Sequence, residues 1–123
     1  MSSEIITLNV PADQDFCDAA MRYLSNPTDP VEVVTRPAMG AVTALRYLAH
    51  THHMTPVEIN VVSATMSDTA GRAALRIDSV AEPVVLIVVD NGEDLPGAQE
   101  VRDRVADLTT HKNIRQVFQV HAA

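Results

Sequence analysis

The alternation of apolar and polar residues along the chain predicts five β-strands. Each segment is rich in β-branched residues and is bounded by Pro, Asn, Asp or Ser, as strands usually are. The segments are 4–10, 31–35, 57–63, 84–90 and 114–120. Segment 84–90 is apolar without interruption until its last residue, which predicts a strand buried on both faces. Segment 114–120 alternates, which predicts an edge strand or a strand covered on one side only.

Helical patterns fill the gaps between these segments. The strands begin about 26 to 30 residues apart, and a parallel crossover needs a dozen residues or more, usually as a helix. Apolar residues recur every three or four positions in 16–24 and 98–108, and segment 38–48 is apolar almost all round. The first two segments therefore predict amphipathic helices, and the third predicts a largely buried one.

The gap at 67–81 fits two structures. A helix can begin at Ser67 or Asp68 and turn Ala70, Ala73, Ala74 and Ile77 inward. A hairpin would instead use 67–71 as its turn and place Leu75 and Ile77 inward. The even strand spacing favours the helix.

With a helix at 67–81, the chain is a single α/β domain over 1–123. Its five-stranded, largely parallel sheet would carry helices on both faces and have about the size of a flavodoxin. The alternative is an α+β sandwich with a β-meander at 57–90.

The charge and cysteine content limit the partners and the compartment. A net charge of −7 repels nucleic acid, and Lys112 is the only lysine, so no direct nucleic-acid binding is expected. The single cysteine, Cys17, excludes an internal disulfide and indicates a cytoplasmic protein, and we interpret it as a partly buried small residue. No signal peptide is apparent, and the longest apolar run, 83–89, is too short for a membrane span. Frequent Arg and Ala with scarce Lys indicate a prokaryotic or phage genome.

Polar residues gather where ligands bind in doubly wound sheets, at the carboxyl ends of the strands. The loop 90–94 carries three carboxylates within five residues, which a Mg²⁺ ion could bring together for phosphate chemistry. The same loop also has the pattern of a turn followed by a helix cap. The sequence contains no glycine-rich phosphate-binding motif. The candidate ligand-binding residues are Ser63, Thr65, Asp68, Asp90, Asn91 and Asp94.

Three histidines, His50, His52 and His53, stand together before Pro56. A zinc site would need a third ligand, and no HExxH motif is present. Histidine near a helix C-terminus interacts favourably with the negative end of the helix, and residues before proline avoid helical conformation. We therefore interpret this segment as a polar helix terminus, and expect neither a metal nor a cofactor.

No combination of nucleophile, base and orienting residue is visible, which argues against an enzyme. The leading hypothesis is a small acidic cytoplasmic interaction protein: an inhibitor, adaptor or accessory factor of phage or mobile-element origin. Its partner would be a basic protein. Its candidate contact residues are Asp13, Asp15, Asp18, Glu100, Asp103 and Asp107. The alternatives are the ligand-binding or magnesium-dependent domain above, and a self-associating module that forms a homodimer.

Overall fold

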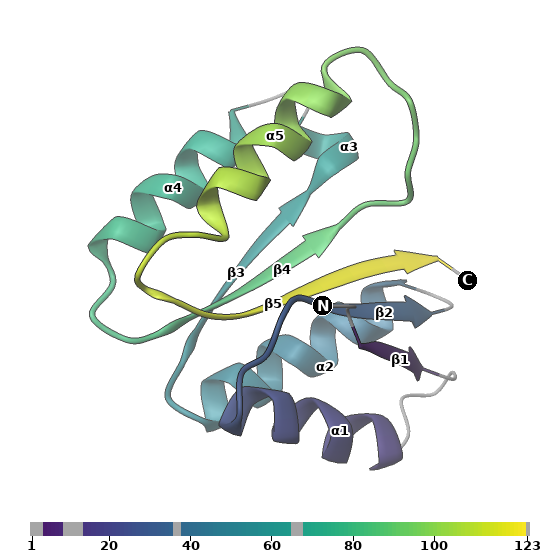
Figure 1. Ribbon diagram of the computed structural model, residues 1–123, viewed down its shortest axis with the longest axis vertical. Helices are drawn as coiled ribbons and strands as arrows, with labels where there is room; N and C mark the ends of the chain where they lie inside the picture. Colours follow the sequence, from purple (N-terminus) through teal and green to yellow (C-terminus); the bar gives the residue numbers. More distant parts are fainter. Residues whose placement is uncertain (1–3, 9–13, 36–37, 65–67, 123) are drawn as a thin grey trace.

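The computed structural model describes residues 4–8, 14–35, 38–64 and 68–122, which form a five-stranded sheet between two layers of helices (Figure 1). Every pair of neighbouring strands is parallel, in the order β1-β2-β5-β4-β3. The strands are β1 (Ile5–Leu8), β2 (Val31–Thr35), β3 (Thr55–Asn60), β4 (Val84–Val89) and β5 (Ile114–Ala122). The predicted α/β class is confirmed, and the alternative meander at 57–90 is wrong because β3 and β4 run parallel.

The helices divide between the two faces according to the direction in which the chain moves across the sheet. They are α1 (Gln14–Ser25), α2 (Ala38–Thr51), the single turn α3 (Val61–Ala64), α4 (Thr69–Ser79) and α5 (Ala98–Leu108). The chain moves from β1 through β2 to β3 and then returns through β4 to β5. Crossovers share one hand, so this reversal puts α1 and α2 on one face and α4 and α5 on the other (Figure 1).

The segment that allowed a helix or a hairpin is the helix α4. The Asp68 side chain accepts a hydrogen bond from the Gly71 backbone N–H and caps the helix. Ala73 and Ile77 are buried, whereas Leu75, which a hairpin would turn inward, is 72% exposed. The structure therefore rules out the hairpin.

The third strand is displaced from its predicted range, 57–63. It begins at Thr55 and ends at Asn60, and the next residues form the helical turn α3. The Asn60 side-chain oxygen accepts a hydrogen bond from the Val62 N–H at 3.1 Å. Such a side-chain turn stops strand pairing, which the apolar character of the segment does not reveal.

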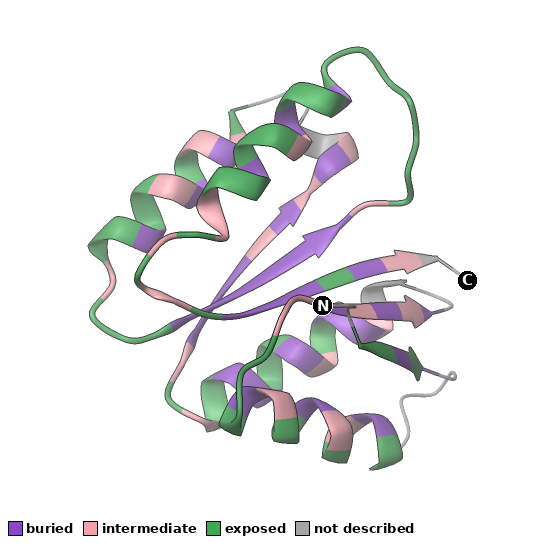
Figure 2. Cartoon of the chain, in the orientation of Figure 1, coloured by how far each residue is buried: buried purple, intermediate pink, exposed green. Residues whose placement is uncertain are grey.

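Two hydrophobic cores lie on opposite faces of the sheet, and β4 contributes to both. Alternate β4 residues point to opposite faces, and Figure 2 shows the strand buried along its whole length. This confirms the prediction for segment 84–90. The α1/α2 core includes Phe16, Leu24, Leu45, Ile87 and Phe118, and the α4/α5 core includes Ile59, Ile77, Leu86, Val101 and Val117.

The last strand, β5, lies in the middle of the sheet, so the edge position, one of the two predicted alternatives, is wrong. The other alternative, cover on one side only, fits Gln119, which is exposed. It pairs with β2 on one side and with β4 on the other. Its alternation has another cause: Phe118 and Val120 enter the α1/α2 core, whereas Gln119 faces the other way and is exposed. The polar residue Gln119 thus reflects incomplete cover on the second face.

The α4/α5 face of the sheet is covered only in part by the helices of the described residues. Helices α4 and α5 lie over β3 and β4, whereas the helices of the described ranges lie against β1 and β2 only on their other side (Figure 1). Ile5 is 66% exposed, and Thr7 is also exposed. We call this area the uncovered face; it consists of Ile5, Thr7, Glu32, Val34, Gln119 and His121.

Candidate functional site

A groove of about 350 Å³ runs between α5 and the uncovered face. It lies near the carboxyl ends of β4 and β5, where the crossover after β2 goes to one face and the crossover after β4 goes to the other. In doubly wound sheets, such a switch point is the usual ligand site. The lining residues are Pro30, Glu32, Val61, Val88, Asp90, Arg102, Val105, Ala106, Thr109, Gln119 and His121.

Strand register brings the polar groups of the groove together. Glu32 of β2 pairs with Gln119 of β5, which pairs with Val88 of β4. His121 follows two residues later, and the Asp90 N–H donates to the Val120 carbonyl at 3.0 Å. Residues from three separate parts of the chain therefore form one surface.

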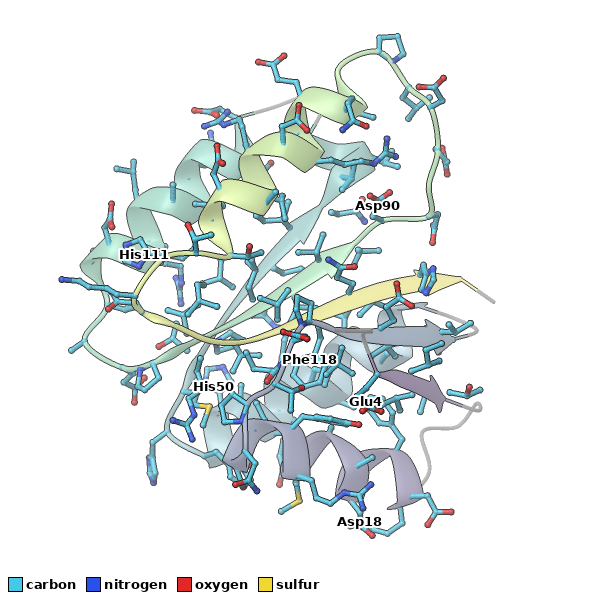
Figure 3. All side chains as sticks on the ribbon, viewed as in Figure 1. Glu4, Asp18, His50, Asp90, His111 and Phe118 are labelled. Carbon is cyan, nitrogen blue, oxygen red and sulfur yellow. The ribbon has the colours of Figure 1, made fainter. Side chains whose placement is uncertain are left out.

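Asp90 and Arg102 form the strongest polar contact of the groove. The guanidinium binds the carboxylate through two hydrogen bonds, Nε to Oδ2 at 2.8 Å and Nη2 to Oδ1 at 3.1 Å. Arg102 also donates to the Glu93 carbonyl at 2.6 Å, and the Gly92 N–H donates to Asp90 Oδ1 at 2.9 Å. The contact ties the loop after β4 to α5, and Figure 3 shows Asp90 at the end of its strand.

These contacts set the charge of the pair. The hydrogen bonds from Arg102, aided by that from Gly92 and by the nearby His121, hold the pKa of Asp90 below its ordinary value against the opposing effect of burial. The hydrogen bond with Asp90 in turn raises the pKa of Arg102. Asp90 is therefore an ionised partner of Arg102, with both carboxylate oxygens engaged.

The loop residues proposed as magnesium ligands do not converge. Both Asp90 oxygens contact Arg102, while Asn91 and Asp94 lie exposed along the loop. Within the described ranges, no group of three or more His, Cys, Asp or Glu side chains could share a metal ion. The geometry offers this hypothesis no support.

Among the described residues, no other predicted ligand-binding residue lines the groove. Asp68 caps α4, and its carboxylate contacts the Arg104 guanidinium at 3.2 Å. The side chain of Ser63 and the whole of Thr65 lie outside the described residues. Of the predicted set, Asp90 alone is among the described residues that line the groove.

The groove also includes polar residues that the sequence patterns did not single out, among them Glu32, Gln119 and His121. No hydrogen bond or ion pair of the Glu32 carboxylate or the Gln119 amide is found within the part of the chain described. The His121 Nε2 atom is buried and, among the described residues, also has no partner. The available signal was the alternation in 31–35 and 114–120, which placed polar residues on one face of each strand.

The predicted acidic contact residues belong to two surfaces. Asp15 and Asp18 are exposed on α1, whereas Glu100, Asp103 and Asp107 are exposed on α5, across the sheet. Asp18 and Asp103 accept hydrogen bonds from Gln14 and Gln99 of their own helices, respectively. Asp13 lies outside the described residues. The two described groups therefore lie on opposite sides of the sheet and do not form a single surface.

The histidine segment forms the end of α2. The helix ends at Thr51, the His52 N–H bonds to carbonyls of the last turn, and His53 takes a positive φ of 57°. The His52 ring nitrogen Nδ1 lies 2.9 Å from the Leu48 carbonyl oxygen. These contacts match the interpretation as a polar helix terminus.

Comparison of the chain with protein-family models, with curated proteins and with solved structures found no match in any of the three. Among residues 4–8, 14–35, 38–64 and 68–122, no helix is long and apolar enough to span a membrane. We therefore base the functional proposal on the groove beside α5 and the sheet face next to it.

Proposed function

We propose that this protein is a cytoplasmic interaction protein that binds a macromolecular partner across the uncovered face, as an inhibitor, adaptor or accessory factor. One observation carries the proposal: in the part of the chain that the structure describes, helices cover β1 and β2 on one side only. Parallel sheets are ordinarily covered on both faces, because their strands are apolar on both sides. An exposed apolar side chain such as Ile5, 66% exposed, is what a partner would bury.

The charge of the molecule indicates a basic protein partner. The net charge of −7 disfavours nucleic acid and favours encounter with a positive surface. The exposed Glu100, Asp103 and Asp107 run along the outer side of α5, next to the groove. A partner lying on the uncovered face would meet α5 at its border, and these residues would then guide its approach.

A second candidate is a small-molecule-binding domain. The groove is within the size range of ligand pockets and lies at the switch point of the sheet. The magnesium and phosphate form of this idea fits less well, because Arg102 already occupies the Asp90 carboxylate.

Capture from host lysate with two matched double variants tests the proposal. The face variant carries Thr7→Arg and Gln119→Arg, both at exposed positions of the uncovered face. The helix variant carries Asp15→Asn and Asp18→Asn on the opposite side of the sheet, and changes the net charge by the same amount. We expect the wild type and the helix variant to capture the same protein, and the face variant to lose it. Circular dichroism establishes that each variant is folded.

Capture that is unchanged in the face variant would reject the uncovered face as the contact. The oligomeric state of the pure protein, measured by light scattering, tests the self-association alternative. If the wild type is a homodimer and the face variant is a monomer, the partner at the uncovered face is a second copy of the chain and not another protein.

A further inference from the structure

We propose that the groove beside α5 receives the guanidinium group of an arginine on the partner protein. The inference rests on the proposed function, because it names the group that the partner inserts. The site consists of the Glu32 carboxylate, the Gln119 amide and the apolar side of α5 around Val105.

An unpaired negative charge lies in the groove. Glu32 is half-buried, and its carboxylate has no ion pair among the described residues. Arg102 is the one Arg or Lys side chain among the described lining residues, and Asp90 and the Glu93 carbonyl engage it. With His121 counted as neutral, the two carboxylates and one guanidinium of the described lining leave a net charge of −1. A cation therefore complements the groove as it stands.

The acceptors of the groove suit a guanidinium. This group has five N–H donors and no acceptor, so it needs several oxygen atoms around it. The Glu32 carboxylate can accept two of these hydrogen bonds, and the side-chain oxygens of Gln119 and Thr109 can accept others. The Thr109 hydroxyl donates its own hydrogen to the Ala106 carbonyl, which leaves its oxygen free to accept.

The apolar lining suits the stem of an arginine. Val61, Val88, Val105 and Ala106 line the groove together with the polar groups. Arginine buries its methylene stem against apolar surface while its charged end contacts polar groups, and its guanidinium is less strongly hydrated than an ammonium.

A phosphate group fits the same groove poorly. It would meet the Glu32 carboxylate, and Arg102 could bind it only by leaving Asp90. An anionic ligand is therefore the opposite outcome and can be tested directly.

Nuclear magnetic resonance titration of the ¹⁵N-labelled full chain tests the inference with three probes. These are N-acetyl-arginine amide, its uncharged counterpart N-acetyl-citrulline amide, and inorganic phosphate. We expect the arginine probe to cause saturable shifts at the amides of 88–90, 102–109 and 119–121. The citrulline probe should bind about tenfold more weakly or worse, because the charge of the hydrogen bonds is lost.

Two glutamate variants connect the binding to the groove. Glu32→Gln should lower the affinity for the arginine probe about tenfold or more, since it removes the unpaired charge. Glu82→Gln makes the same change at an exposed residue before β4, outside the groove lining, and should leave the affinity unchanged. Equal binding of the citrulline probe, an affinity unaffected by Glu32→Gln, or phosphate shifts at the same amides would each overturn the inference.

The capture experiment separates this inference from the proposed function. Partner capture that depends on the uncovered face, without groove shifts from the arginine probe, rejects the arginine site and retains the interaction protein. The opposite result is probe binding that needs Glu32, together with partner capture that is the same in the face variant and the wild type. That result rejects the proposed function.

Discussion

Asp90 connects the end of β4, the loop that follows it and helix α5. Its carboxylate accepts from the Gly92 N–H of its own loop and from both guanidinium nitrogens that Arg102 offers from α5. The residue was predictable as a site residue because it follows the buried strand directly. Its partner was not, since an arginine on an amphipathic helix resembles any other solvated charge.

The contact between Asp90 and Arg102 should make the free energy of unfolding depend on pH. The folded-state pKa of Asp90 is lower than its value in the unfolded chain, which is about 3.9. The contact therefore contributes its full stability above that pH, and the contribution is lost as pH falls through the lower folded value. We expect Asp90→Asn to be less stable than the wild type at pH 7, and the difference to shrink in acid.

Urea unfolding between pH 7 and pH 3 measures this effect. Asp15→Asn is the control, because it removes one exposed carboxylate that makes no ion pair within the described residues. A gap between Asp90→Asn and wild type that stays constant with pH would show that the charge of Asp90 is not the cause.

Two helical glycines differ in the space beside them, and alanine substitution should reveal it. A Cβ on Gly71 would lie 2.5 Å from both carboxylate oxygens of Asp68, the cap of α4. No heavy atom of the described chain lies within 4 Å of a Cβ on Gly40 in α2. We expect Gly40→Ala to stabilise by about 0.5–1 kcal/mol, as alanine does in a helix.

Gly71→Ala should gain nothing, because the displaced cap costs about 1 kcal/mol and offsets the helix propensity of alanine. Thermal unfolding of the two variants beside the wild type makes the comparison. Equal stabilisation by both substitutions would show that Asp68 caps the helix without needing the space beside Gly71.

Among the elements, β5 is the strand whose local sequence pattern does not reveal its position in the sheet. Alternation predicted its strand conformation correctly; of the two positions it allowed, the edge is wrong, whereas cover on one side only fits Gln119. Alternation depends on what covers the two faces of a strand, and says nothing of which strands pair along its sides. With Phe118 in the α1/α2 core and Gln119 on the uncovered face, a middle strand acquires the pattern of a one-sided strand.

Neighbouring substitutions in β5 should therefore differ greatly in cost. Phe118 is fully buried, so Phe118→Ala should destabilise by about 3–5 kcal/mol. Gln119 is exposed, so Gln119→Ala should change the stability by no more than about 0.5 kcal/mol. Denaturant unfolding of both variants gives the comparison, and similar costs at the two positions would contradict the assigned faces of the strand.

For the whole molecule, the order of the strands determines which parts are most firmly held. β4 and β5 are bonded on both sides and contribute side chains to both cores, whereas β1 has four residues and a free edge within the described sheet. Local opening is easier where few contacts must break. We expect the backbone amides of β4 and β5 to exchange most slowly, and those of β1 to exchange much faster.

Hydrogen exchange followed by mass spectrometry tests this order in the free protein. Repeating it with the captured partner extends the test, because binding across the uncovered face should slow exchange in β1 and β2. Protection that appears in α1 instead would place the partner on the opposite side of the sheet.

Local patterns along the chain favoured the α/β class over the α+β alternative, and they predicted the burial of β4 and the position of Asp90 at a strand end. These features follow from local periodicity and from short-range turn and cap chemistry, which neighbouring residues specify. The folded molecule was needed to show that β5 lies between β2 and β4, and hence that Glu32, Gln119 and Asp90 share one groove. Pairing of distant strands depends on how the whole core packs, because one alternating strand is compatible with many neighbours.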